Sequence, residues 1–167
     1  MTCLFELSIA LLITLLNGFF VMAEYSLVRI RKSRLDELIR QGKSRANTVL
    51  KMSEKLDTYL SATQLGITAS SLLLGWFGGP LLAEMFRGMF GVSAGTWYDH
   101  SLVFACAFLI IVFLHVVFGE LVPRTIALGK VEQVAMAVAY PLVFFHYLLY
   151  PLVVLFNRIS HAVLCLL

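Results

Sequence analysis

The sequence predicts an all-α membrane protein with three transmembrane helices, a proline-broken segment that re-enters or lies along the membrane, and cytosolic amphipathic helices. Of the 167 residues 60% are hydrophobic and only 14% are charged. The apolar residues gather in four long runs, at residues 7–23, 58–83, 101–119 and 134–157. Each run is close to or above the ~20 residues that a helix needs to cross the hydrocarbon core.

The first run is expected to be a retained span. The residues before it contain Glu6 and no Lys or Arg, whereas a secretory signal peptide begins with a positive segment. The second and third runs, residues 58–83 and 101–119, complete the three expected spans.

The fourth run differs because Pro141 and Pro151 lie inside it. Each proline removes a backbone donor and clashes with the preceding turn, so that a helix breaks or kinks there. We therefore expect residues 134–157 to dip into the membrane and return, or to wrap the bundle on the cytoplasmic side. Four full spans are the alternative.

The basic residues predict the orientation. Nine of the thirteen Lys and Arg residues fall within residues 29–55, and loops rich in these residues stay in the cytoplasm. The N-terminus is then outside and, with three spans, the C-terminus is cytoplasmic. The expected location is the plasma membrane, which in bacteria is the inner membrane.

The same basic segment predicts two short amphipathic helices on the inner membrane face. Acids and leucines interleave with the bases, which argues against nucleic-acid binding. The helices are expected on either side of Gly42, because the apolar residues recur at helical spacing and are interrupted there. These apolar residues are Leu35, Leu38, Ile39, Val49, Leu50 and Met52.

Polar residues inside the spans are candidate functional residues, because they are costly in lipid and often mark a pathway or a partner. In the first span, Asn17 and Glu24 lie on one helical face. In the second span, Gln64, Thr68 and Ser71 lie along one side. Small and polar residues of this kind also serve simply to pack membrane helices.

Residues 119–124 form the most specific candidate site. In a continuing α-helix the amide of residue 123 would bond the carbonyl of Gly119, but Pro123 has no amide hydrogen. A free carbonyl beside the Glu120 carboxylate supplies the oxygen ligands that Mg²⁺ or Na⁺ prefers, and we expect both to face the interior of the bundle. In the alternative interpretation, Glu120 pairs with Arg124 and Pro123 simply ends the helix.

Three blocks of sequence resemble the transmembrane domain of the CNNM/CorC family of hemolysin-like membrane proteins with CBS domains. They are LNGFFVMAEYSLVRIRKSRL at 16–35, LDTYLSATQLGIT at 56–68 and GELVPRTIALG at 119–129. The resemblance covers nearly all of residues 1–167. It implies a homodimeric domain in the lipid bilayer, followed beyond residue 167 by cytosolic CBS and CorC-type regulatory domains of the same full-length chain.

The resemblance also implies Mg²⁺ export, coupled to Na⁺ entry, with the ion held by a serine, an asparagine, a glycine carbonyl and a glutamate. Gly119 and Glu120 match the last two ligands. The serine position is Ala23, next to Glu24, and the asparagine position is Thr68, with Gln64 one turn earlier as a substitute amide. The expected metal residues are Glu120, Gly119, Thr68, Gln64 and Glu24, and the expected pathway or structural residues are Asn17, Ser71, Pro123 and Arg124.

Three functions follow from these residues. The first is a transporter for Mg²⁺ or another divalent cation. The second is an exporter of an organic cation such as a polyamine, which is favoured because Ala23 and Thr68 offer fewer ligands for an inorganic ion. The third is a non-transporting membrane anchor and dimerisation module. Enzyme activity and a resident cofactor are not expected, because no nucleophile, base and orienting residue occur together. His115 is expected to bond a neighbouring helix.

Overall fold

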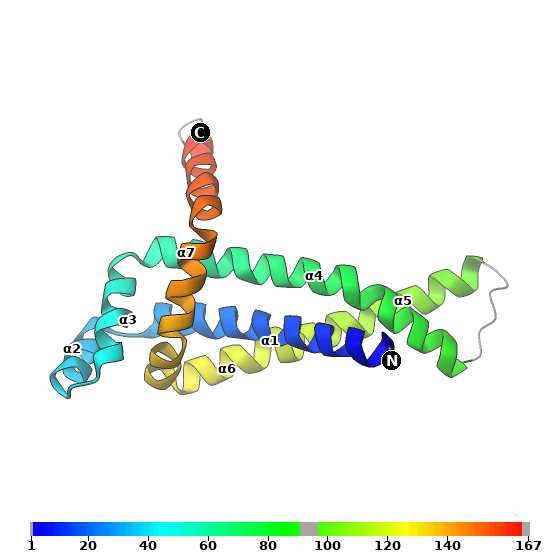
Figure 1. Cartoon of the computed structure of the whole chain (residues 1–167), viewed down its shortest axis with the longest axis horizontal. Helices are drawn as coiled ribbons and strands as arrows, with labels where there is room; N and C mark the ends of the chain where they lie inside the picture. Colours follow the sequence, from blue (N-terminus) through cyan, green and yellow to red (C-terminus); the bar gives the residue numbers. More distant parts are fainter. Residues whose placement is uncertain (1, 91–96, 165–167) are drawn as a thin grey trace. The chain divides into compact units, whose positions relative to one another are not determined.

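Every element of the described chain is helical, as the sequence predicts (Figure 1). The computed structural model describes the backbone of residues 2–90 and 97–164, and the side chains of residues 7–78, 105–106 and 108–159. The chain divides into two compact units, each described by itself. The first unit is Met1–Gly18 with Thr68–Val122, and the second is Phe19–Ile67 with Pro123–Leu167.

Eight helical elements follow one another along the described chain. They are α1 (Thr2–Arg29), α2 (Lys32–Arg40), α3 (Ser44–Glu54), α4 (Leu56–Phe90), α5 (Trp97–Leu114), the π-helix η1 (His115–Leu121), α6 (Val122–Gly129) and α7 (Val131–Leu164). The elements α5, η1 and α6 follow one another without a gap.

Three helical segments of the described chain are long and apolar enough to cross a membrane, which is the predicted number, although one of them lies in the fourth run, which is expected to re-enter or lie along the membrane. They are Leu7–Arg29, Phe108–Gly129 and Val131–Ile159. The first and second correspond to the predicted spans at residues 7–23 and 101–119. The predicted span at 58–83 is not among them, and it runs beyond Gly78, the last residue of α4 whose side chain is described.

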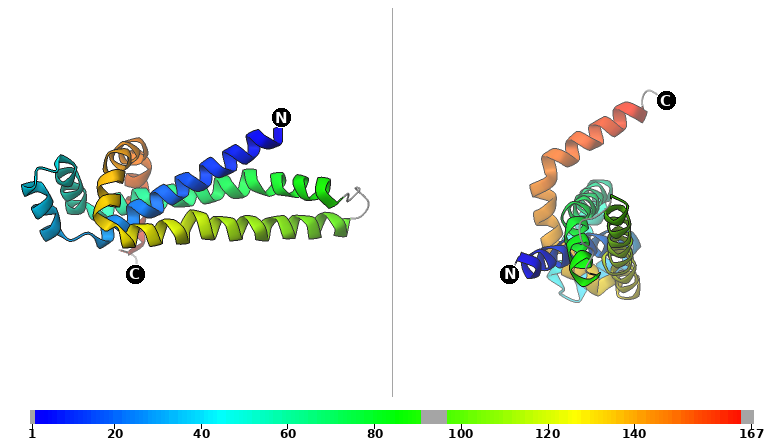
Figure 2. Two further views of the ribbon diagram at one scale, coloured as in Figure 1. Left: turned by 90° about the horizontal axis from the view of Figure 1, so that it is seen from below. Right: turned by 90° about the vertical axis from the view of Figure 1, so that its right-hand side faces the viewer.

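The predicted break in the fourth run is wrong, because α7 is one helix from Val131 to Leu164 with Pro141 and Pro151 inside it. Its direction changes along its length (Figure 2), as expected for a proline-containing helix. Membrane helices tolerate internal proline where neighbouring groups satisfy the freed carbonyls. Each proline therefore removes one backbone hydrogen bond from α7, and the helix bends there but does not end.

In the first unit, α4 and α5 run side by side in opposite directions (Figure 2). The N-terminal part of α1 belongs to the same unit. Leu11, Leu12 and Leu15 of α1 are exposed, as are Phe113 and Phe118 on α5 and η1. Large exposed apolar side chains are unfavourable in water but suit a helix surrounded by acyl chains.

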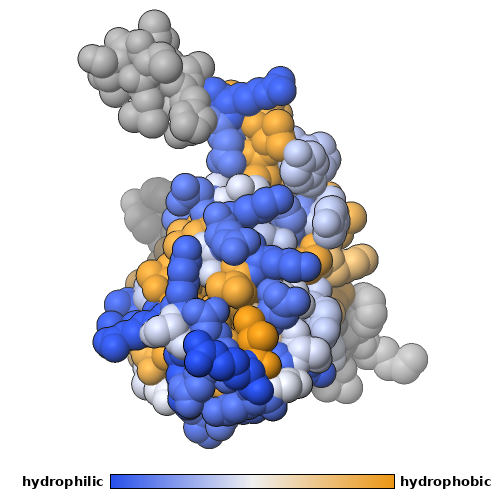
Figure 3. Space-filling view, turned by 90° about the vertical axis from the view of Figure 1, so that its left-hand side faces the viewer, coloured by the Kyte–Doolittle hydropathy of each residue, from blue (hydrophilic) through white to orange (hydrophobic). Residues whose placement is uncertain are grey.

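The second unit contains two short amphipathic helices, α2 and α3, in the predicted segment, and their location on the inner membrane face stays a prediction. Gly42, whose φ of 80° suits glycine, separates α2 from α3. The buried side chains of these two helices are Leu35, Leu38, Ala46, Val49 and Met52. On the exposed side, Arg34 of α2 donates to both carboxylate oxygens of Glu132 at the start of α7, at 2.6 and 3.3 Å. Figure 3 shows the hydrophilic residues gathered over this end.

Aromatic packing in the second unit depends on Gly66 of α4. A Cβ atom at this position would lie 2.6 Å from three ring atoms of Phe20. The Phe20 ring is itself 2% exposed and packs edge-on against Phe19 and Phe145, at centroid distances of 5.3 and 5.1 Å. The ring therefore has little room to retreat, and glycine is needed at position 66.

We expect Gly66→Ala to destabilise the domain by about 1–3 kcal/mol, since overpacking forces rings and backbone to shift. Thermal unfolding in detergent, followed by circular dichroism, measures this as a lower midpoint. Gly129→Ala is the matched control, because a Cβ at Gly129 meets nothing within 4 Å. Equal midpoints for the two variants would contradict the proposed role of Gly66.

Candidate functional site

The candidate site is built around the π-helical segment η1. Val122, which follows η1, donates its backbone N–H to the carbonyl of Val117, five residues earlier. Pro123 is the second residue of α6 and is buried. Its ring nitrogen carries no hydrogen, so the α-helical bond from residue 123 to the Gly119 carbonyl cannot form. Wider turns of this kind are rare and are frequent at functional sites.

The Gly119 carbonyl is bonded by a side chain from another helix. Asn17 of α1 donates from Nδ2 to this oxygen at 2.9 Å, in the interior of the first unit. Asn17 is 1% exposed, and its other polar atom, Oδ1, is buried without a hydrogen-bond partner among the described residues. The pair thus joins two spans and leaves one amide oxygen available in the interior.

His115, the first residue of η1, extends the polar contact to a third helix. Its Nε2 lies 3.0 Å from the Oγ of Ser71 on α4, which confirms the expectation that His115 bonds a neighbouring helix. Its Nδ1 is buried and has no hydrogen-bond partner among the described residues. A Cβ on Gly119 would lie 2.9 Å from this Nδ1 and 3.2 Å from Asn17 Nδ2. Glycine at position 119 therefore lets His115 and Asn17 approach the same backbone segment.

Glu120 does not face the interior of the first unit, contrary to what the sequence predicts. Its side chain is exposed in the single chain, whereas the preceding Gly119 is buried. The reason is helical geometry, since successive residues point in directions about 100° apart. With Gly119 against Asn17, the Glu120 side chain points away from Asn17 to the surface of the single chain.

The remaining predicted site residues are distributed over both units. Thr68 of the first unit and Gln64 of the second are exposed, and Glu24 of the second is half-buried. In the second unit, the Arg124 guanidinium lies over the Tyr25 ring at 4.6 Å, a cation–π contact that the sequence does not predict.

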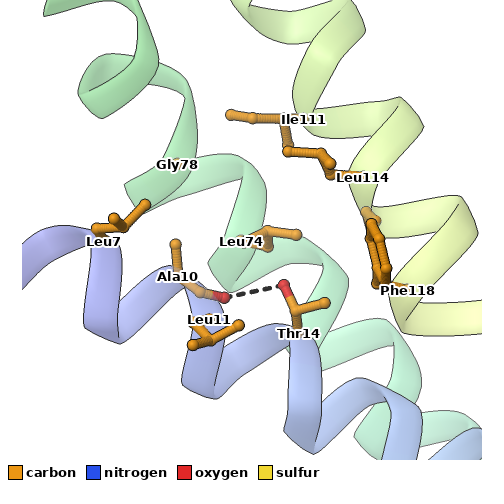
Figure 4. A pocket seen from close by; sticks show the side chains of 10 residues that line it. Leu7, Ala10, Leu11, Thr14, Leu74, Gly78, Ile111, Leu114 and Phe118 are labelled. Atoms are coloured by element: carbon orange, nitrogen blue, oxygen red, sulfur yellow. Dashed lines mark hydrogen bonds between the residues drawn. The ribbon is translucent and has the colours of Figure 1, made fainter. Parts of the chain in front are cut away.

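An apolar pocket of 340 Å³ adjoins the polar residues of the first unit (Figure 4). Leu7, Ala10, Leu11 and Thr14 line it from α1, one helical face at i, i+3, i+4 and i+7 spacing. Its other walls are Leu74 and Gly78 of α4, and Ile111, Leu114, His115 and Phe118 of α5 and η1. The Thr14 hydroxyl is turned away to the Ala10 carbonyl at 2.9 Å. The pocket offers an apolar environment and only His115 as a polar boundary.

Residues 7–167 match the protein family described as the cyclin M transmembrane N-terminal domain. The chain belongs to this family. It is 41% identical to the UPF0053 protein YugS of Bacillus subtilis over 85% of its length, and 42% identical to the UPF0053 protein YhdT of the same organism over 90%. It is 38% identical over 93% of its length to the uncharacterized protein Rv1841c of Mycobacterium tuberculosis. The chain spans 33%, 32% and 44% of the lengths of these relatives.

The family match confirms the resemblance indicated by the three sequence blocks. The cyclin M domain described here is an integral membrane domain, with three candidate spans. Its described residues contain no group of three His, Cys, Asp or Glu side chains in a metal-binding arrangement. A cation held by the described residues would therefore have at most two such side chains and would depend otherwise on amide, hydroxyl and carbonyl oxygens.

Sequence reasoning missed the contacts that organise the site in this cyclin M domain. The sequence predicts Asn17 as a pathway or structural residue, but its bond to Gly119, 102 positions later, has no signal in one sequence. Ser71 and His115 both stand out as polar residues within apolar runs, yet nothing in their spacing predicts their contact. The missing amide hydrogen of Pro123 is the one local signal of this site, because it frees the Gly119 carbonyl, which then needs another donor.

Proposed function

We propose that this cyclin M domain moves a cation across the membrane, exporting Mg²⁺ or another divalent cation in exchange for Na⁺. In this proposal the transported ion is bound by the Gly119 carbonyl, by the unpartnered amide oxygen of Asn17 and by Glu120, whose exposed carboxylate turns inward when the ion binds. Thr68 of the same unit supplies a further oxygen along the path. The basic segment at residues 29–55 favours an orientation with this segment in the cytoplasm of a plasma membrane.

The observation that carries the proposal is the contact between Asn17 and Gly119. A buried amide without a partner for its oxygen is unfavourable, and such an atom in a native protein calls for an explanation such as a water or an ion. Asn17 Nδ2 occupies one lone pair of the Gly119 carbonyl, which has a second. Hard cations select oxygen ligands of these types, and unwound or widened helices present them in transporters.

The exposure of Glu120 supports a homodimer. A carboxylate within the candidate span Phe108–Gly129 is costly if it faces lipid, and such residues almost always face protein or a water-filled cavity. A second copy of the chain would cover Glu120, and with it the apolar side chains around it. Cytosolic regulatory domains of a longer chain would then act on this dimer.

Export of an organic cation such as a polyamine is a second candidate. The observation that favours it is Ala23, which is fully buried and has no side-chain oxygen at the position where the family resemblance implies a serine ligand. Fewer fixed oxygens weaken selection for Mg²⁺, which demands near-octahedral geometry. An organic ammonium group needs a counter-charge and hydrogen-bond acceptors but no fixed coordination geometry, so a site with few oxygens suits it better than Mg²⁺.

Flux through the purified domain in lipid vesicles distinguishes these functions. Vesicles are loaded with Mg²⁺ or with spermidine, and efflux is followed with and without external Na⁺. The expected result is Na⁺-dependent Mg²⁺ efflux at least tenfold above protein-free vesicles. Spermidine efflux unaffected by Mg²⁺ would select the second candidate, whereas a dimer that moves neither solute would leave a membrane anchor.

A further inference from the structure

A hollow of 480 Å³ lies in the second unit, between the turn that joins α2 to α3 and the first turns of α7. It is separate from the residues of the proposed cation path. Its lining residues are Gly42, Lys43, Ser44, Arg45, Gln133, Met136 and Ala137. Polar and positively charged side chains therefore form one wall, and α7 contributes an amide and two apolar side chains.

The turn geometry holds the basic residues at the hollow. Gly42 adopts a φ of 80°, which a residue with a side chain adopts only with strain, and the chain then enters α3 at Ser44. The Arg45 guanidinium lies 5.6 Å from the centre of the Tyr140 ring of α7. This cation–π contact positions the guanidinium and leaves its N–H groups free to bind an anion.

The charge of the hollow is positive. Lys43 and Arg45 are both exposed and line it, and no acidic residue is among its lining residues. The nearby acid, Glu132, is bonded through both oxygens to Arg34. Arg34 also pairs with Glu37, and Glu132 interacts with Lys43 as well. Three basic side chains (Arg34, Lys43 and Arg45) therefore stand against two acids, and the net positive charge favours an anionic ligand.

The ends of two candidate spans predict that the hollow lies at the depth of the lipid headgroups. The candidate span Leu7–Arg29 ends shortly before α2, and the candidate span Val131–Ile159 begins two residues before Gln133. Residues on this boundary meet the phosphates of the lipids, and the apolar side chains of Met136 and Ala137 continue from the hollow into the span. Basic pockets at membrane interfaces are known to suit anionic headgroups.

We propose that this hollow binds the phosphate of an anionic phospholipid from the adjacent leaflet. Lys43 and Arg45 contact the phosphate, Ser44 and Gln133 donate hydrogen bonds to the headgroup, and Met136 and Ala137 contact the start of its acyl chains. The proposal concerns lipid binding alone and does not depend on which solute the domain transports.

Native mass spectrometry of the detergent-solubilised domain tests this site, with phosphatidylglycerol as the anionic lipid and phosphatidylcholine as the neutral one. The wild type is expected to bind phosphatidylglycerol at least tenfold more tightly than phosphatidylcholine. Each of Lys43→Gln and Arg45→Gln is expected to weaken phosphatidylglycerol binding about fivefold, and the double variant about 25-fold. Ser44→Asp places a negative charge in the hollow and is expected to weaken binding at least as much as one basic substitution.

The matched control is the double variant Arg31→Gln and Lys51→Gln, which removes the same charge from exposed residues of the same unit outside the hollow. It is expected to change binding by twofold or less. Equal losses in the two double variants would overturn the proposal in favour of general surface attraction. Equal binding of both lipids would also overturn it, as would full displacement of phosphatidylglycerol by millimolar inorganic phosphate, which would identify a free-phosphate site. Circular dichroism confirms that each variant is folded.

Discussion

Replacing Glu120 by Gln is expected to reduce cation efflux from reconstituted vesicles at least about 100-fold. Loss of even an outer-shell partner costs a metal site about 10- to 100-fold in affinity, and a direct carboxylate ligand matters at least as much. The fold is expected to persist, because the Glu120 side chain is exposed in the single chain. Efflux is measured with a fluorescent Mg²⁺ indicator, and the helical content by circular dichroism.

Two further variants make the Glu120 result specific. Glu120→Asp keeps the charge and is expected to retain more efflux than Glu120→Gln. Glu54→Gln removes an exposed carboxylate at the end of α3 and is expected to leave efflux unchanged. Wild-type efflux in Glu120→Gln would remove this residue from the mechanism. An equal loss in Glu54→Gln would indicate an effect of overall charge.

Gly119→Ala is expected to disrupt the site and to destabilise the domain by about 1–3 kcal/mol. The added Cβ would lie 2.9 Å from His115 Nδ1 and 3.2 Å from Asn17 Nδ2, so that the hydrogen bond from Asn17 to the Gly119 carbonyl is strained. Both effects lower the thermal midpoint of the detergent-solubilised protein. Efflux is expected to fall in parallel, because the ion-binding carbonyl moves.

Gly75→Ala is the control in the same unit, since a Cβ at Gly75 meets nothing within 4 Å. It is expected to be neutral or stabilising, as replacement of glycine by alanine within a helix usually is. The double variant Gly119→Ala with Asn17→Ala should cost less than the sum of the single variants, because truncation of Asn17 relieves one of the two close contacts. Strict additivity would show that the Cβ does not act through Asn17.

The fold was predictable where the signal is local. Apolar runs gave the number of spans, and the spacing of Leu35, Leu38, Val49 and Met52 around Gly42 gave α2 and α3. The break expected at Pro141 and Pro151 failed because proline removes one bond in a helix that neighbouring groups can still support. Whether a proline breaks or bends a helix depends on the neighbouring groups in the folded protein, and the residues next to the proline in the sequence do not reveal them.

The candidate site was predictable only in part, for a related reason. The missing amide of Pro123 correctly indicated a carbonyl at Gly119 that needs another donor. Which donor reaches it depends on how α1 packs, and Asn17 could be placed on a helical face but not against a partner. The direction of Glu120 follows from that same packing, which is why the prediction that it faces the interior failed.

Asn17 of α1 and Ser71 of α4 each share a hydrogen bond with η1. Sliding η1 along its axis would break both together, at a cost of about 0.6 kcal/mol for each bond between membrane helices, and would expose their polar atoms to lipid. Moving the first-unit parts of α1 and α4 together with η1 breaks neither bond. A movement of this kind would keep the oxygens of Asn17 and Gly119 at their present spacing.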